Sequence, residues 1–66
     1  MLIVLNGEHR EFEKDGTVAS LLEMLGLSGQ RLAVEVNGEI VPRSEHPDCV
    51  LREGDRVEVV RAIGGG

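Results

Sequence analysis

Two stretches of the chain place apolar segments on both sides of an Asn-Gly pair. In the first, the apolar run 2–5 leads into Asn6-Gly7, and the chain continues through polar residues that include Phe12. In the second, apolar positions alternate over 32–36, and the chain turns at another Asn-Gly pair before it returns through Ile40-Val41. Because Asn-Gly accepts the positive φ angles of a tight turn, both stretches are predicted to form β-hairpins.

Between the hairpins the apolar spacing changes from two to three and four residues, which is typical of a helix with one buried stripe. The stripe consists of Val18, Leu21, Leu22 and Leu25. Thr17 is placed to cap the start of this helix, and Gly26 is placed to end it. A helix of about nine residues is too short to persist alone in water, so it is expected to pack on the sheet.

The remainder of the chain is predicted to be a loop followed by one long strand. Pro42 ends the second hairpin, polar residues describe a loop over 43–49, and Val50-Leu51 are expected to enter the core. After the turn at 53–55, the last strand is expected to cover 56–63.

The order strand, strand, helix, strand, strand, strand predicts an α+β fold of the β-grasp, or ubiquitin-like, type. It would have a mixed sheet of about five strands with one main helix on one face. The most apolar strands, 1–5 and 56–63, are expected at the centre. The domain would span 1–63, and 64–66 would form a flexible glycine tail.

Composition narrows the class of function. A chain of 66 residues is one small domain in which a deep catalytic cleft is hard to build, so a binding or carrier module is favoured. The net charge of -5 and the absence of Trp and Tyr argue against nucleic acid as a partner. A single cysteine, no signal-peptide pattern and no apolar run of about 20 residues indicate a cytoplasmic protein without membrane association.

Side chains with catalytic or metal-binding potential are few. Cys49 follows His46 by three residues, but nothing in the sequence supplies an orienting third group or an oxyanion hole, so Cys49 is interpreted as a small hydrophobe. His9 and His46 lie on different elements without a metal-ligand spacing, so no metal site is predicted.

The glycines that close the sequence suggest a different chemistry. With no Cβ, Gly65 and Gly66 can thread a narrow channel of a partner enzyme, and the carbonyl carbon of Gly66 is open to nucleophiles. A carboxylate is a poor electrophile, so it would have to be activated, for example by a partner that adenylates it with ATP. The protein would then be a substrate and not an enzyme. The alternative is a frayed end with no role.

Several segments together resemble the ThiS family, the sulfur carrier proteins of thiamine biosynthesis. The resemblance covers the whole chain, and its most specific parts are "VNGEIVPR", "EGDRVEVV" and "AIGGG". It implies that a ThiF-type enzyme adenylates Gly66 and that a cysteine-derived persulfide converts it to a thiocarboxylate. A thiazole synthase of the ThiG type would then receive the sulfur. Gly64 is an extra glycine where many family members have another small residue.

The resemblance also leaves the docking surface and the pathway open. An aliphatic patch on the uncovered face of the sheet is expected to dock on the partner enzymes, with Val57, Val59 and Ile63 as candidates, and no bound cofactor is expected. Alternatives are the small subunit of molybdopterin synthase, a modifier joined to lysines through Gly66, and a noncovalent β-grasp binding module. An enzyme built on Cys49 is a further alternative.

Overall fold

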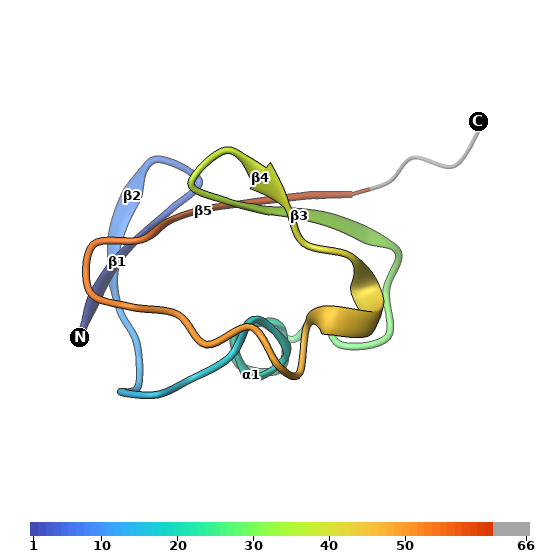
Figure 1. Cartoon of the computed structure of the whole chain (residues 1–66), viewed down its shortest axis with the longest axis horizontal. Coiled ribbons are helices and arrows are strands. Elements are labelled where there is room, and N and C mark those ends of the chain that lie inside the picture. The colour runs from blue at the N-terminus through green and yellow to red at the C-terminus, as the bar shows by residue number, and fades with distance from the viewer. Residues whose placement is uncertain (62–66) are drawn as a thin grey trace.

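The computed structural model describes residues 1–61, which form one mixed sheet with a helix beneath it (Figure 1). The elements are β1 Leu2–Leu5, β2 Glu8–Glu11, α1 Val18–Met24, β3 Leu32–Val36, β4 Glu39–Ile40, a 3-10 helix at Arg43–Glu45 and β5 Arg56–Arg61. The expected order of strands and helix is confirmed. Of the predicted last strand, residues 62–63 lie outside the described part, and so does the predicted boundary between body and tail.

The strand order in the sheet is β2-β1-β5-β3-β4, so β5 lies at the centre with β1 beside it. β1 and β5 run parallel, and the pairs β1 with β2, β3 with β4 and β3 with β5 are antiparallel. A long connection that contains α1 separates the two hairpins and allows the parallel pairing. The predicted β-grasp arrangement, with the two most apolar strands at its centre, is confirmed.

Both Asn-Gly pairs form the predicted turns. Asn6 and Gly7 have φ angles of 49° and 84°, and Asn37 and Gly38 have 53° and 87°. Two successive positive φ angles are the signature of the type I′ turn, whose twist matches that of the flanking strands. The turns therefore fix the register of both hairpins.

The helix is capped at its start as the sequence predicts. The Thr17 hydroxyl accepts a hydrogen bond from the Ser20 N–H (3.1 Å), and the Ser20 hydroxyl accepts one from the Thr17 N–H (2.8 Å), which completes a capping box. The loop 46–49 passes over the same end, where the carbonyls of His46 and Cys49 accept the N–H groups of Ala19 and Val18. The free amides of the first helical turn are thereby satisfied within the chain.

Alternate residues of the central strands point toward α1 and form the core. Its nine buried members are Ile3, Leu5, Phe12, Val18, Leu21, Leu22, Val34, Leu51 and Val57. The prediction that Val50 and Leu51 both enter the core is half right, because Leu51 is 2% exposed whereas Val50 is 49% exposed. The helix covers one face of the sheet, and the opposite face is free of any other element among residues 1–61 (Figure 1).

Candidate functional site

The predicted carrier end follows β5 in the sequence. Gly66, the predicted covalent site, lies outside the described residues, as do Gly64, Gly65 and Ile63. Of the strand that leads to them, the structure describes Arg56–Arg61, and Arg61 pairs with Leu32 of β3. The site can therefore be built from the strand that carries the tail and from the surfaces around it.

Backbone bonds and one side chain attach β5 to the first hairpin. The Val4 N–H donates to the Asp55 carbonyl (2.9 Å), and the Asn6 N–H donates to the Val57 carbonyl (2.9 Å). Two residues further along β5, the Asn6 carboxamide accepts from the Val59 N–H (2.8 Å) and donates to the Val59 carbonyl (3.3 Å). The sequence indicates Asn6 only as a turn residue, and nothing in its pattern shows that its side chain reaches β5.

The structure corrects the docking prediction for Val57. This residue is 1% exposed and belongs to the core between the sheet and α1, so it cannot contact a partner. The sequence does hold a signal for this, because Arg56 and Glu58 alternate with Val57 and Val59. Two valines that share a face opposite two charged side chains are expected on the side that the helix covers.

Val59 also points toward the helix side, but it is only partly buried. It lines a groove with a volume of about 320 Å³, together with residues of β1, β2 and the end of α1, among them Leu5, Leu25 and Leu27. Asn6 lies in the same lining. Val59 as a docking residue stays a prediction, and this groove is one place where a partner could contact it.

The uncovered face of the sheet carries a different set of exposed apolar side chains. By register they share a face with Arg56 and Glu58, the residues that alternate with the buried valines. Val60 is 57% exposed, Ile40 62% and Leu2 37%. Ala33, which pairs with Val60, is exposed as well. We call Leu2, Ala33, Ile40 and Val60 the open-face patch.

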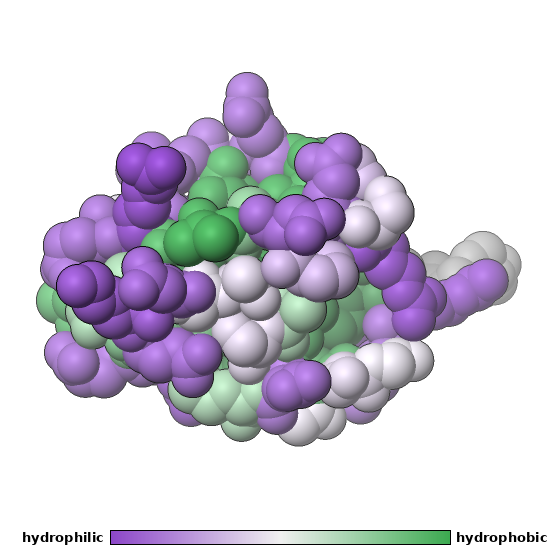
Figure 2. Space-filling view, turned by 60° about the horizontal axis from the view of Figure 1, so that its bottom comes forward, coloured by the Kyte–Doolittle hydropathy of each residue, from purple (hydrophilic) through white to green (hydrophobic). Residues whose placement is uncertain are grey.

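The side of the molecule that carries α1 has hydrophobic and hydrophilic residues interspersed on its surface. When the side where α1 lies in Figure 1 is turned forward, hydrophobic residues appear as small areas between hydrophilic ones (Figure 2). Met24 and Val50, which are 48% and 49% exposed, do not belong to the open-face patch. On β5 itself, the most exposed apolar side chain is Val60, which is the residue before the last one that the structure describes.

Cys49 and His46 do not form a nucleophile and base. Partial burial raises the pKa of the Cys49 thiol, and the nearby carboxylates of Asp55 and Glu45 raise it further, so the thiol stays protonated at neutral pH. The His46 ring is 7% exposed, and its Nε2 donates a hydrogen bond to the Val41 carbonyl (3.1 Å). That nitrogen is therefore not available to take a proton from a thiol.

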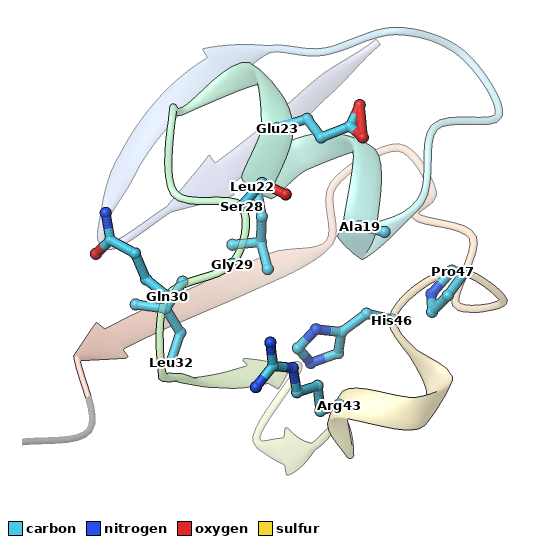
Figure 3. Close-up of a pocket in the computed structure, with 10 residues that line it drawn as sticks. All are labelled: Ala19, Leu22, Glu23, Ser28, Gly29, Gln30, Leu32, Arg43, His46 and Pro47. Carbon is cyan, nitrogen blue, oxygen red and sulfur yellow. The ribbon is translucent and has the colours of Figure 1, made fainter. Parts of the chain in front are cut away.

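His46 also borders the pocket drawn in Figure 3, which has a volume of about 220 Å³. Arg43 and His46 approach it from the segment after β4, and Leu22 and Gln30 line the other side. The side chains that line this pocket are mixed in polarity, and none of them is a nucleophile paired with a base. The pocket therefore offers no catalytic arrangement.

Residues 1–61 were compared with the requirements of a metal site and of a membrane-spanning helix. That part of the chain contains no cluster of three or more His, Cys, Asp or Glu side chains that could hold a metal ion. His9 lies on the exposed strand β2, whereas His46 is buried near α1. None of the helices in the described part is long and apolar enough to cross a bilayer.

Comparison with known proteins identifies the family of this chain. The model of the ThiS family matches residues 3–66. The sulfur carrier protein ThiS of Thermus thermophilus is 42% identical over 65 residues, which are 98% of this chain and 100% of that protein. The chain belongs to the ThiS family. Within this family, the ThiS crystal structure from Geobacter metallireducens has a TM-score of 0.87 and 29% identity, and the match covers 100% of both chains.

Proteins of another kind also match this ThiS-family chain. A thiazole synthase of Paramagnetospirillum magneticum is 46% identical over 66 residues, and one of Magnetococcus marinus is 44% identical. In both cases the match covers 100% of this chain but 20% of the thiazole synthase. The chain thus spans about a fifth of the length of these two relatives.

Proposed function

We propose that this protein carries sulfur for the formation of the thiazole ring in thiamine biosynthesis, with Gly66 as the site of attachment. The observation that carries the proposal is the match of the ThiS family model through residue 66, together with full-length similarity to proteins named sulfur carriers. The described body fits this role, because its central strand β5 is the last element before the glycines.

The proposed reaction begins with activation of the Gly66 carboxylate. One carboxylate oxygen attacks the α-phosphorus of ATP in a ThiF-type enzyme and displaces pyrophosphate, which gives an acyl adenylate. The terminal sulfur of a cysteine-derived persulfide then attacks the acyl carbon, and AMP leaves. A thiol reduces the resulting acyl disulfide to the thiocarboxylate and is itself oxidised to a disulfide.

In this reaction the protein is a cosubstrate. ATP binds to the partner enzyme, so the carrier needs no cofactor of its own, and we place it in the cytoplasm with these partners. Gly64, Gly65 and Gly66 would enter the partner's active site, where the absence of Cβ atoms leaves the acyl carbon accessible. The proposal requires a free carboxyl group at Gly66, and the intact mass of the protein from its native host tests this directly.

Thiazole synthase is the proposed acceptor of the sulfur. Two proteins named thiazole synthase contain a segment that is similar to this entire chain. A carrier and its acceptor that occur in one polypeptide are held at high effective concentration, which is expected when they act in succession. We propose that this carrier likewise passes its sulfur to a thiazole synthase.

The open-face patch is the proposed docking surface. Val60 and Ala33 are adjacent across the central strands, and Arg56 and Glu58 on the same face supply charges around them. An apolar centre with charged neighbours is the usual composition of a protein interface. Because Val60 precedes Gly66 by only six residues, contact at this patch would place the tail close to the partner's active site.

Intact mass spectrometry tests the function. The purified protein is incubated with a ThiF-type enzyme, ATP, a persulfide donor and a thiol, and we expect a gain of about 16 Da as sulfur replaces one oxygen. Omission of ATP should abolish the gain. A chain that keeps its mass in the complete reaction would contradict the proposal. A loaded chain that acts as the small subunit of molybdopterin synthase, and does not pass its sulfur to thiazole synthase, would reassign the pathway.

A further inference from the structure

The two sides of β5 are supported very differently. On the side of β3, pairing extends along the strand from Val57 to Arg61. On the side of β1, paired residues occur only at Arg56 and Val57, because β1 ends at Leu5 and turns away. The C-terminal half of the described strand therefore has a neighbouring strand on one side only.

Asn6 compensates for the missing strand. Asp55, Val57 and Val59 are alternate residues whose backbone groups face the first hairpin. The first two carbonyls accept the N–H groups of Val4 and Asn6. At Val59 the Asn6 carboxamide takes over, accepting from the N–H at 2.8 Å and donating to the carbonyl at 3.3 Å. The side chain thus continues the ladder by one step beyond the end of β1.

The chemistry of asparagine suits this position. Its carboxamide has one acceptor and one donor group in a plane, as a peptide unit has, so it can satisfy both backbone groups of Val59. Asparagine also tolerates the positive φ of 49° that the turn requires at this residue. Glycine would satisfy the turn without the side chain, and an ionised aspartate would offer acceptors only.

We propose that Asn6 is a positioning residue for the carrier end, because its carboxamide holds the backbone of Val59 and so fixes the course of β5 toward Gly66. This inference rests on the proposed sulfur-carrier function. A carrier whose final strand is already held in place enters the partner's active site without a further ordering cost. Loss of the two hydrogen bonds between Asn6 and Val59 reduces the fraction of carrier molecules whose last strand is in the binding conformation, which raises the apparent KM.

Asn37 provides a matched control. It is also the first residue of an Asn-Gly turn, with a φ of 53°, and its Oδ1 also accepts a hydrogen bond from β5, namely from the Arg56 N–H (2.9 Å). Arg56 is the first residue of β5, whereas Val59 is close to its end. Asn6→Gly and Asn37→Gly therefore make the same chemical change at opposite ends of the strand.

Kinetics of activation give the first test. The rate of ATP–pyrophosphate exchange by a ThiF-type enzyme is measured over a range of carrier concentrations. For Asn6→Gly we expect KM to rise about five- to tenfold with kcat within about twofold of the wild type. For Asn37→Gly we expect both constants to stay within about twofold. Equal KM values for Asn6→Gly and the wild type, or an equal rise in both variants, would overturn the proposal.

Amide hydrogen exchange gives a second test that needs no partner enzyme. In Asn6→Gly the Val59 amide should exchange about tenfold faster than in the wild type, because its acceptor is gone. The Glu58 amide, on the β3 side, should change little. An unchanged Val59 rate overturns the inference whatever the kinetics show. Absence of sulfur loading in the wild type would instead overturn the proposed function, and exchange at Val59 would still decide whether Asn6 holds the strand.

Asn6→Asp separates the two hydrogen bonds. The carboxylate keeps an acceptor for the Val59 N–H but has no donor for the Val59 carbonyl. Its KM is expected to lie between those of the wild type and Asn6→Gly. If the KM of Asn6→Asp equals that of the wild type, the Nδ2 group of Asn6, which donates to the Val59 carbonyl, has no role.

Discussion

Cys49 illustrates how surroundings decide the chemistry of a single residue. Its carbonyl accepts the Val18 N–H at the start of α1, and its side chain packs partly against the core. Partial burial and the carboxylates of Asp55 and Glu45 raise the pKa of the thiol, which disfavours the reactive thiolate. The backbone of Cys49 contributes to the fold, while its sulfur has no partner for catalysis.

Slow alkylation of Cys49 is the expected consequence. At pH 8 the folded protein should react with iodoacetamide several-fold more slowly than the same protein unfolded in urea, as followed by mass spectrometry.

The same pKa shift predicts how stability depends on pH. Because folding raises the pKa of the Cys49 thiol, the thiol of the unfolded chain ionises first as pH rises, so this group lowers the free energy of unfolding above about pH 8.5. Cys49→Ala should lack that decrease and should load sulfur normally. Loss of loading would return Cys49 to the candidate site.

Gly16 is required for a reason that the sequence does not reveal. A Cβ at this position would overlap the ring of Phe12, the only aromatic residue, and would lie 2.8 Å from Cγ of Glu13. Gly16→Ala is expected to lower the free energy of unfolding by about 1–3 kcal/mol, because Phe12 is 5% exposed and its ring cannot move without repacking the core.

A double-mutant cycle tests this account of Gly16. Urea denaturation is measured for Gly16→Ala, Phe12→Leu and the double variant. We expect the cost of Gly16→Ala to fall by at least about 0.5 kcal/mol in the Phe12→Leu background, since the overlapping ring atoms are gone. Additive costs would show that Phe12 is not the source of the strain.

At the scale of elements, the sequence predicted the helix and the hairpin turns, which depend on residues close together in the chain. Hairpin turns follow from Asn-Gly, and the helix follows from the three- and four-residue spacing, with Thr17 as its cap. The 3-10 helix at Arg43–Glu45 was missed because three residues are too few for a periodic pattern. Val50 is exposed while Leu51 is buried because Val50 forms a β-bridge with Thr17. This contact joins residues that are distant in the sequence, so the local pattern does not predict it.

Val60 tests the proposed role of the sheet as a docking surface. Val60→Asp places a charge in the open-face patch and should weaken binding to a ThiF-type enzyme by about tenfold in calorimetric titration. Stability should change little, since Val60 is 57% exposed. Val50→Asp is the matched control, because Val50 is 49% exposed and lies outside the patch. An equal loss of affinity in both variants would contradict docking through the open face.

For the whole molecule, the sequence was sufficient for the β-grasp topology but not for the site. Element order and the two most apolar strands indicated the sheet and its centre, and the parallel pairing of β1 with β5 confirms this. The site depends on contacts over long separations, such as that of Asn6 with Val59, for which a single sequence carries no pattern. Val57 was misassigned although its alternation with Arg56 and Glu58 was visible.

The proposed division of the molecule into a folded body and a reactive end gives the last prediction. All nine residues of the core cluster in the described part lie between Ile3 and Val57, so removal of Gly65 and Gly66 takes away none of them. The free energy of unfolding should therefore change by less than about 0.5 kcal/mol. Sulfur loading, in contrast, should be lost completely, because the acyl carbon that accepts sulfur is absent.

Urea denaturation and intact mass after the loading reaction measure the two effects on the same truncated protein. Gly64→Ala is the control, since it keeps the terminal acyl group and adds one methyl group two residues away from it. It should load sulfur at a rate closer to the wild type than Gly66→Ala, whose methyl group crowds the reacting carbon. A truncated protein that still gains sulfur would place the acceptor elsewhere in the chain, and one that unfolds would show that the carrier end also stabilises the body.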